Sequence, residues 1–151
     1  MAKTIEVKDL KAHEGEHLGT SDWHAVTQEQ VNLFAEATGD HQWIHVDPER
    51  AKAGPFGGTI AHGYLTLSLI PGLTGSLYRV EDLAMGINYG TEKVRFPAPL
   101  PVGTSVRAGA ELVSVKETGQ GYQVVVRVTV EAEGIAKPVC VAEIVVVLVP
   151  A

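Results

Sequence analysis

The feature that most constrains the fold is an almost wholly apolar stretch, Tyr64 to Ile70, which directly follows Gly63. We predict that it forms a helix with apolar side chains on all sides, and such a helix belongs in a protein core. Pro71 is expected to kink or end this helix, because its ring removes an amide donor and collides with the preceding turn. Other elements of the chain must therefore enclose it.

The residues after this helix predict the enclosing structure, because they form segments rich in Val and other strand formers, separated by turn residues. In the clearest segment, side chains from Tyr122 to Val130 alternate between an apolar and a polar face, as in a sheet with one buried side. We predict an α+β fold, an antiparallel sheet packed on a buried helix, in a single domain spanning residues 1–151. The expected strands are Leu83 to Tyr89, Lys93 to Phe96, Thr104 to Val115, Tyr122 to Ala132 and Val139 to Val149.

Helix signals in the first half of the chain bound a short polar segment. Thr27 begins a capping box, and Gly39 stands where a helix commonly ends, so a helix is predicted from about Gln28 to Thr38. Asp47 followed by proline starts a second short helix, which Gly54 and the next proline close. The residues between Gly39 and Asp47 are therefore expected to be a loop.

This loop contains a carboxylate and an imidazole, Asp40 and His45. With ordinary pKa values of about 3.9 and 6.5, both can hold one water between them at neutral pH and move its protons. Gly63 lies at the start of the apolar helix, where amides suit an oxygen on which negative charge develops. The simpler alternative is that Asp40 satisfies backbone donors after Gly39 and His45 packs against Trp43.

Several other residues invite a chemical interpretation. A metal site is not expected, because Asp40, His41, His45 and Asp47 would need a helical segment to share a face. Cys140 lies in an apolar strand and is interpreted as an inert core thiol. We expect His62 to bond the loop to neighbouring backbone, and Ser68 either to touch a ligand or to bond back to its own helix.

The same residues resemble the MaoC-like, NodN-like branch of the (R)-specific enoyl-CoA hydratase family, also called hydratase 2. Gln42 and Trp43 replace the Asn-Pro of the family pattern. The stretches Ile60–Gly63 and Lys93–Pro99 are also family-like, and the resemblance covers most of the chain. The residues that match the main motif are Phe34, Thr38, Gly39, Asp40, Ile44, His45 and Ala51.

The resemblance implies a hotdog fold, a sheet wrapped around a central helix, in a homodimer. It implies reversible syn hydration of trans-2-enoyl-CoA to (R)-3-hydroxyacyl-CoA, with Asp40 and His45 catalytic and the Gly63 amide binding the thioester oxygen. No cofactor is implied beyond the CoA of the substrate. Acyl-CoA thioesterase and a non-catalytic acyl-thioester binding module are the alternatives. The residues expected to contact substrate are Gln42, Ile60, His62, Ser68, Asn88 and Arg95.

Composition bounds the partners and the compartment. A net charge of -6 and a pI near 5.4 argue against nucleic acid or an anionic membrane as the main partner. Cys140 is the only cysteine, which suits a reducing compartment. The first residues lack the apolar stretch of a signal peptide, and the run Ile144 to Val149 is far shorter than the ~20 residues of a membrane span. We therefore expect a cytoplasmic protein without membrane insertion.

Overall fold

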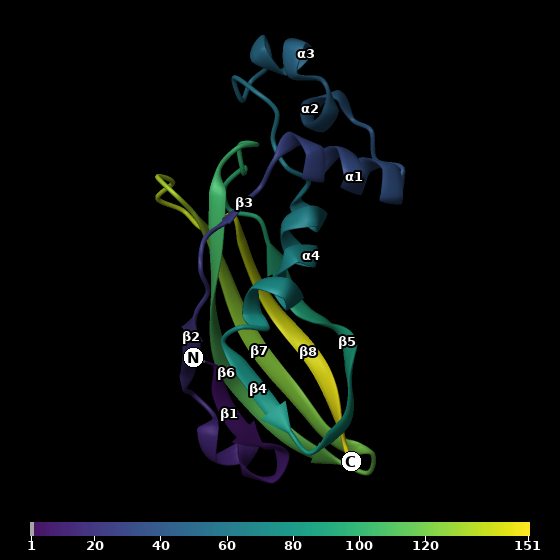
Figure 1. Ribbon diagram of the computed structural model, residues 1–151, viewed down its shortest axis with the longest axis vertical. Coiled ribbons are helices and arrows are strands. Elements are labelled where there is room, and N and C mark those ends of the chain that lie inside the picture. Colours follow the sequence, from purple (N-terminus) through teal and green to yellow (C-terminus); the bar gives the residue numbers. More distant parts are fainter. Residues whose placement is uncertain (1) are drawn as a thin grey trace.

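A long antiparallel sheet packed against one helix dominates the computed structural model, which describes residues 2–151 (Figure 1). The sheet has the strand order β2-β6-β7-β8-β5, and β3 pairs with β6 outside this path. The helix, α4 (Gly63–Thr74), lies across the sheet. The strands of this sheet are β2 (His17–Thr20), β3 (His24–Ala25), β5 (Leu83–Arg95), β6 (Ser105–Thr118), β7 (Gly121–Ala132) and β8 (Cys140–Pro150).

The remaining elements lie at the two ends of this sheet. Near one end, two short strands pair in parallel beside a 3-10 helix. At the other end, three helices project beyond the sheet (Figure 1). These elements are β1 (Lys3–Glu6), η1 (Val7–His13), α1 (Gln28–Thr38), α2 (Trp43–Val46), α3 (Pro48–Lys52) and β4 (Tyr78–Glu81).

Strand β7 forms the centre of the core, as its alternating pattern predicts. Val124, Val126, Val128 and Val130 are all buried, and their neighbours in between are partly exposed. β7 pairs with β6 on one side and with β8 on the other, so its backbone donors and acceptors are used in both directions. The antiparallel sheet on a helix is confirmed.

Helix α4 differs from the prediction at its end and on one face. It does not end at Pro71 but continues to Thr74, because the turn beyond the proline is anchored in the core: Leu73 and Thr74 are buried. The Thr74 hydroxyl also donates to the Ile70 carbonyl at 2.9 Å. Tyr64 remains 70% exposed, so the helix is not enclosed on all sides within one chain.

Two further predictions about local structure are wrong. The expected strands Leu83 to Tyr89 and Lys93 to Phe96 are one continuous strand, β5, which absorbs the irregular residues between them as register shifts against β8. The expected loop from Gly39 to Asp47 contains one helical turn, α2. This turn closes because the Trp43 carbonyl accepts a hydrogen bond from the Asp47 amide at 3.1 Å.

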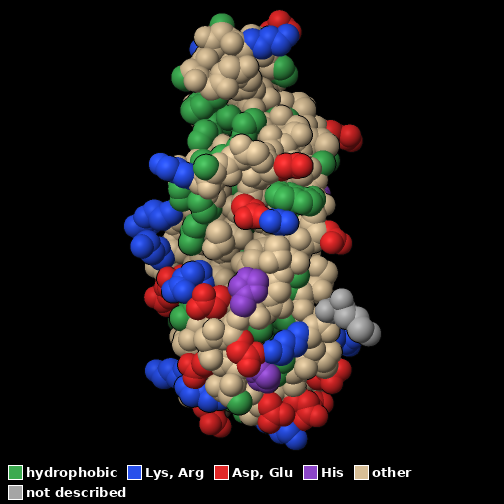
Figure 2. Space-filling model, turned by 90° about the vertical axis from the view of Figure 1, so that its left-hand side faces the viewer, with side chains coloured by type: hydrophobic (Ala, Val, Ile, Leu, Met, Phe, Trp, Pro, Cys, Tyr) green, Lys and Arg blue, Asp and Glu red, His purple; other side chains and the backbone are tan. Residues whose placement is uncertain are grey.

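The surface carries charges of both signs. On the face seen in Figure 2, acidic and basic side chains are interspersed, and they are denser toward one end of the molecule. Among residues 2–151, helices that combine the length and the apolar character needed to cross a bilayer are absent.

Candidate active site

Asp40 owes its position to the end of α1. The Thr27 side chain caps the start of this helix, and Gly39 ends it in the left-handed region, at φ 83°. Asp40 follows directly and is exposed. One of its carboxylate oxygens accepts a hydrogen bond from the Gln42 backbone amide at 3.3 Å, so the other oxygen is free to bind a substrate or a water.

His45 lies on α2, and only 7% of its surface is exposed. Its Nδ1 is 2.7 Å from the Ile60 carbonyl oxygen, which can only accept, so Nδ1 donates and Nε2 carries the lone pair of the neutral ring. Burial lowers the pKa of His45; nearby His62 lowers it further, whereas the Ile60 carbonyl and the Asp40 charge oppose the shift. His45 therefore stays neutral and basic to lower pH than an exposed histidine.

Gln28 fixes the same region from the first turn of α1, and the sequence interpretation missed it. Its side-chain nitrogen donates to the His45 carbonyl at 2.7 Å, and its side-chain oxygen accepts the Thr59 hydroxyl at 2.7 Å. It thus ties the helix that carries His45 to the loop that precedes α4. Nothing in the local pattern of residues signals this contact, because it joins segments distant in the chain.

His62 joins the two parts of the site. Its Nε2 donates to the Asp40 carbonyl at 3.0 Å, which is the loop-supporting bond expected from the sequence. Its ring stacks on His45, with centroids 3.9 Å apart and planes inclined by 25°, and contacts the Phe34 ring at 4.9 Å. One nitrogen or oxygen from each of Asp40, His45 and His62 lies within 4.8 Å of the others. The site therefore brings three side-chain heteroatoms into one small cluster.

This cluster differs from the metal-ligand set considered from the sequence. His41 is exposed and lies 3.6 Å from Glu36, while Asp47 caps α3. The carboxylate and the two imidazoles of the cluster are groups that can hydrogen-bond to a small molecule or hold a metal ion.

Gly63 is the first residue of α4, and the preceding residue makes no side-chain cap of the helix start. Its amide is therefore one of the unsatisfied donors of the first turn, directly after His62. A Cβ at this position would lie 3.0 Å from the Phe96 ring, so only glycine fits without movement. The structure thus places an amide donor and the Asp40–His45 pair in one region.

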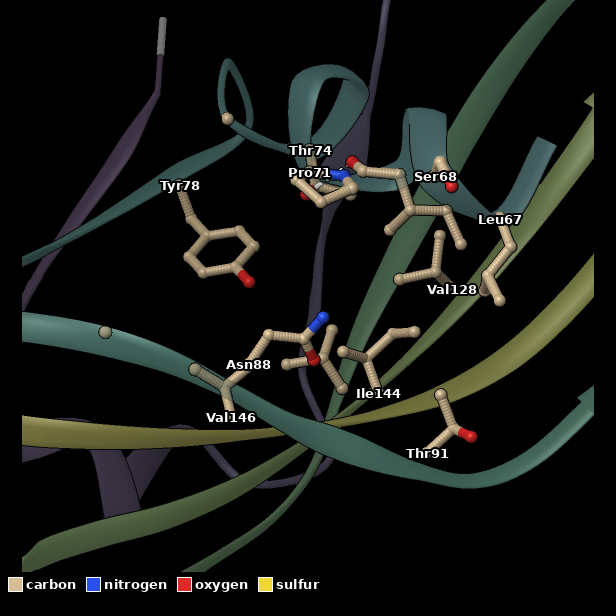
Figure 3. Close-up of a pocket in the computed structure, with 14 residues that line it drawn as sticks. Leu67, Ser68, Pro71, Thr74, Tyr78, Asn88, Thr91, Val128, Ile144 and Val146 are labelled. Carbon is tan, nitrogen blue, oxygen red and sulfur yellow. Dashed lines mark hydrogen bonds between the residues drawn. The ribbon is translucent and has the colours of Figure 1, made fainter. Parts of the chain in front are cut away.

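A cavity of about 650 Å³ lies between α4 and the sheet. Two of the predicted substrate contacts, Ser68 and Asn88, line it, and Figure 3 shows Asn88 pointing from β5 toward the helix. The Ser68 hydroxyl also bonds back to the Tyr64 carbonyl at 2.6 Å. Tyr78 and Thr91 line the same cavity and were not predicted. Its walls are largely apolar, with valines, leucine and isoleucine from α4, β7 and β8.

Three other predicted residues are placed as follows. Gln42 and Arg95 are exposed, and the Arg95 guanidinium donates to the Val94 carbonyl at 2.7 Å. Ile60 contributes its backbone, through the carbonyl that accepts from His45. Cys140 is fully buried, and burial raises the pKa of its thiol to about 11, which agrees with an inert core residue.

Solved structures with a similar fold define the class of protein. A structure described as a monoamine oxidase regulatory protein from Archaeoglobus covers 100% of this chain and 99% of its own, at 27% identity and a TM-score of 0.82. The (R)-hydratase from A. caviae, involved in PHA biosynthesis, covers 89% of this chain and 96% of its own, at 25% identity and a TM-score of 0.74. The chain has the hotdog fold of these proteins, as expected.

Within that class, the chain belongs to the MaoC-like domain family, whose model matches residues 9–134. It is 62% identical over 143 residues to 3-hydroxyacyl-thioester dehydratase Z of Mycobacterium tuberculosis, covering 93% of this chain and 95% of the relative. It is 43% identical over 141 residues to nodulation protein N of Rhizobium leguminosarum bv. viciae, covering 91% and 88%. The expected enzyme class, hydro-lyase, is confirmed by this membership.

Proposed function

We propose that the protein is an (R)-specific enoyl-CoA hydratase, which adds water reversibly to trans-2-enoyl-CoA to give (R)-3-hydroxyacyl-CoA. The observation that carries the proposal is the cluster of Asp40, His45 and His62, which is directly followed in the chain by Gly63 at the start of α4. Hydration requires two kinds of group: an acid/base pair of side chains that holds the water, and a backbone donor for the thioester oxygen. The hydratase and dehydratase names of the relatives above support the same chemistry.

The reaction follows from these groups. Asp40 and His45 hold one water; its oxygen attacks C3 while one O–H proton passes to the pair. The π electrons move toward C1, and the thioester oxygen becomes enolate-like and accepts a hydrogen bond from the Gly63 amide. When the carbonyl forms again, C2 receives a proton from the Asp40–His45 pair, on the face that the water attacked. No cofactor enters any of these steps.

The cavity along α4 suits the acyl chain of the substrate. Its first lining residue is Leu67, about one helical turn or ~6 Å from Gly63, and lining continues to Thr74, ~16 Å from Gly63 along the helix axis. A thioester held at Gly63 can therefore direct its chain into an apolar space. We propose that substrates with acyl chains longer than crotonyl bind more tightly, up to the length at which the acyl chain reaches Tyr78 at the far end of the cavity.

The function is tested by an assay of trans-2-enoyl-CoA substrates of increasing length, with the (R) and (S) products resolved. Asp40→Asn should lower turnover by about 10²–10⁴-fold and leave the fold intact, as expected when a general base is lost. Undiminished hydration by Asp40→Asn would refute the assignment of this residue. Release of thiol from acyl-CoA without hydration would favour the thioesterase alternative, and acyl-CoA binding with unchanged enoyl absorbance would favour a binding module.

We also propose that two copies of the chain pair along β5. This strand is at an edge of the sheet, and its exposed apolar side chains include Ile87 and Tyr89. Edge strands with exposed apolar residues favour pairing with another chain. The alternation of the strand directs Asn88 into the cavity and Ile87 away from it. A partner here would also lie next to the exposed face of α4.

The pairing is tested by light scattering after size exclusion. Ile87→Lys should convert a dimer into a monomer, because it places a charge at the centre of the paired edge. Gln120→Lys, in the exposed turn between β6 and β7, is the control and should remain a dimer. A wild-type protein that is monomeric at micromolar concentration would contradict the proposal.

A further inference from the structure

A second, smaller cavity adjoins the cavity along α4, which is named the acyl cavity from this point. The second cavity measures about 50 Å³, and every residue that lines it apart from Tyr78 has an aliphatic side chain. It lies in the core, because its lining residues Leu10, Leu112 and Val124 are each at most 3% exposed. Protein cores are close-packed and keep few voids larger than a water molecule. An apolar void beside a substrate cavity is space that an apolar part of the substrate can fill.

The two cavities share a floor and one wall. Their common lining residues are Tyr78, Val126 and Val146. Val126 and Val146 lie on β7 and β8, so the same sheet forms the floor of both cavities. Among the residues that the structure describes, Tyr78 is the common lining residue that lies outside this sheet. Its side chain is therefore the wall between the two cavities.

Strand β4 places this wall at the far end of the acyl cavity. Figure 3 shows the Tyr78 ring at the end of the cavity that lies away from Leu67. Tyr78 and Val80 are two positions apart on β4, so their side chains leave the same face of the strand. Tyr78 lines both cavities, whereas Val80 lines only the second one. An acyl chain that advanced past the Tyr78 ring would next meet Val80.

The backbone beneath the ring is fixed by its neighbours. β1 pairs in parallel with β4, and Ile5 lies opposite Val80. The Lys3 amide also donates to the Leu77 carbonyl, directly before Tyr78, at 2.9 Å. The Tyr78 ring is partly buried and packs against the core, and this burial raises the pKa of its hydroxyl, so the side chain is neutral at physiological pH. The size of the ring, and not a movable backbone, thus decides whether a chain can pass.

We propose that Tyr78 sets the longest acyl chain that the protein accepts, because its ring closes the passage from the acyl cavity into the second cavity. The inference rests on the proposed hydratase function and concerns the far end of the same substrate. The second cavity is then a binding site for the last carbons of a longer acyl chain, and it opens only when the ring is truncated. Its aliphatic walls suit methylene and methyl groups and offer nothing to a polar one.

The dimensions of α4 give the expected limit. The helix extends ~16 Å from Gly63 to Thr74, and Tyr78 follows shortly after its end. An extended acyl chain advances by ~1.3 Å per carbon, because its bonds of ~1.5 Å meet at about 111°. About twelve carbons therefore reach the wall. A cavity of about 150 Å³ can hold a benzene ring, so removing the ring of Tyr78 and joining the second cavity makes room for about four more carbons.

The test compares two substrates, trans-2-dodecenoyl-CoA and trans-2-hexadecenoyl-CoA. The ratio of kcat/KM for the longer to the shorter substrate measures the length limit, because effects on the chemical step cancel. We expect a low ratio in the wild type and in the matched control Tyr78→Phe, which keeps the ring. Tyr78→Ala should raise the ratio by about tenfold or more, since a single methylene in an apolar pocket changes kcat/KM by about 10–200-fold. Tyr78→Leu should raise it less, and it replaces Tyr78→Ala if that variant does not fold.

Val80→Phe tests whether the longer chain enters the second cavity. Added to Tyr78→Ala, it fills this cavity from β4 and should return the ratio to the wild-type level. Alone, it should leave the wild-type ratio unchanged, because the Tyr78 ring already closes the passage. If the double variant keeps the high ratio of Tyr78→Ala, the chain does not use the second cavity and the inference is overturned.

A measurement on the wild-type protein does not depend on the folding of any variant. In the complex with dodecanoyl-CoA, nuclear Overhauser contacts should join the terminal methyl of the acyl chain to the Tyr78 ring. The same methyl should show no such contact with the Val80 methyl groups. A contact with Val80 in the wild type would overturn the inference, because the passage would then be open.

The inference and the proposed function fail in different ways. If the wild type hydrates the shorter substrate and Tyr78→Ala keeps the wild-type ratio, only the role of Tyr78 fails. A wild type that hydrates both substrates equally well would also overturn that role. If the wild type hydrates no enoyl-CoA of any length, the proposed function fails, and the contacts of bound dodecanoyl-CoA with Tyr78 and Val80 then decide the inference.

Discussion

The role of the Gly63 amide can be tested by removing its hydrogen without removing the helix. Proline is well tolerated at the first position of a helix, where its missing N–H bonds to no residue of the helix. His62, which precedes it, has φ -60° and ψ 136°, an extended conformation that is compatible with a following proline. Gly63→Pro should therefore preserve α4 while it removes the donor proposed to bind the thioester oxygen.

A steric effect must be separated from the loss of the donor. Any Cβ at this position lies 3.0 Å from the Phe96 ring, whereas carbon atoms are comfortable at about 3.5–4.0 Å. The ring or the helix start must then move by about 0.5–1 Å, and a 1 Å displacement of a reacting group can cost about 10²-fold in rate. Phe96 is 41% exposed, so truncating it creates room at little cost to the core.

The informative comparison is therefore made in a Phe96→Ala background. There, Gly63→Ala has room and keeps its amide, so its kcat for crotonyl-CoA should match that of Phe96→Ala alone within about threefold. Gly63→Pro has the same room and lacks the amide, so its kcat should fall by about 10²–10³-fold, or about 2.7–4 kcal/mol of transition-state stabilisation. Loss of enoyl absorbance measures the rate, and circular dichroism checks folding. If the two folded double variants are equally active, the Gly63 amide does not bind the thioester oxygen.

Three further predictions concern protonation, thiol reactivity and metals. Burial lowers the pKa of His45 below that of the unfolded chain, so the unfolded state binds more protons below pH ~6.5. The free energy of unfolding should therefore decrease as the pH falls in that range. Urea titrations at several pH values measure this slope, and His45→Gln should flatten it. Cys140, fully buried with a pKa raised to about 11, should react with a thiol reagent only after denaturation, and rapid labelling of native protein would contradict its placement. Hydration should survive dialysis against EDTA unchanged, and a loss that Zn²⁺ restores would refute a metal-independent mechanism.

The parts of the fold that depend on local chemistry could be predicted from the sequence. Helix α1 has the predicted bounds because its ends are set by Thr27 and Gly39, which act through their own neighbours. The alternation in β7 likewise predicts its buried face. The continuation of α4 past Pro71 could not be predicted, because it depends on contacts that bury Leu73 in the core.

The components of the candidate site stand out in the sequence, but its geometry does not. Asp40, His45 and Gly63 stand out because their residue types suit the chemistry and turn signals bracket them. The stack of His62 on His45 and the two bonds of Gln28 join segments far apart in the chain, and no spacing rule reports such contacts. The cavity is hidden for the same reason, since it exists only where α4 meets β5 and β8.

The departure from the family pattern at Gln42 and Trp43 acquires a physical account from these contacts. A proline at position 43 would restrict the backbone before it, whereas here the Trp43 ring provides the restraint by packing. Arg50 lies 4.4 Å above this ring, and a Cβ at Gly54 would lie 3.0 Å from it, so Trp43 is held tightly against α3 and the turn that follows. With the Asp40 carbonyl bonded to His62, both ends of the short segment that carries Asp40 and His45 are fixed. Tertiary packing thus restrains the segment as a proline ring would do locally, so the replacement of Asn-Pro is compatible with a fixed arrangement of Asp40 and His45.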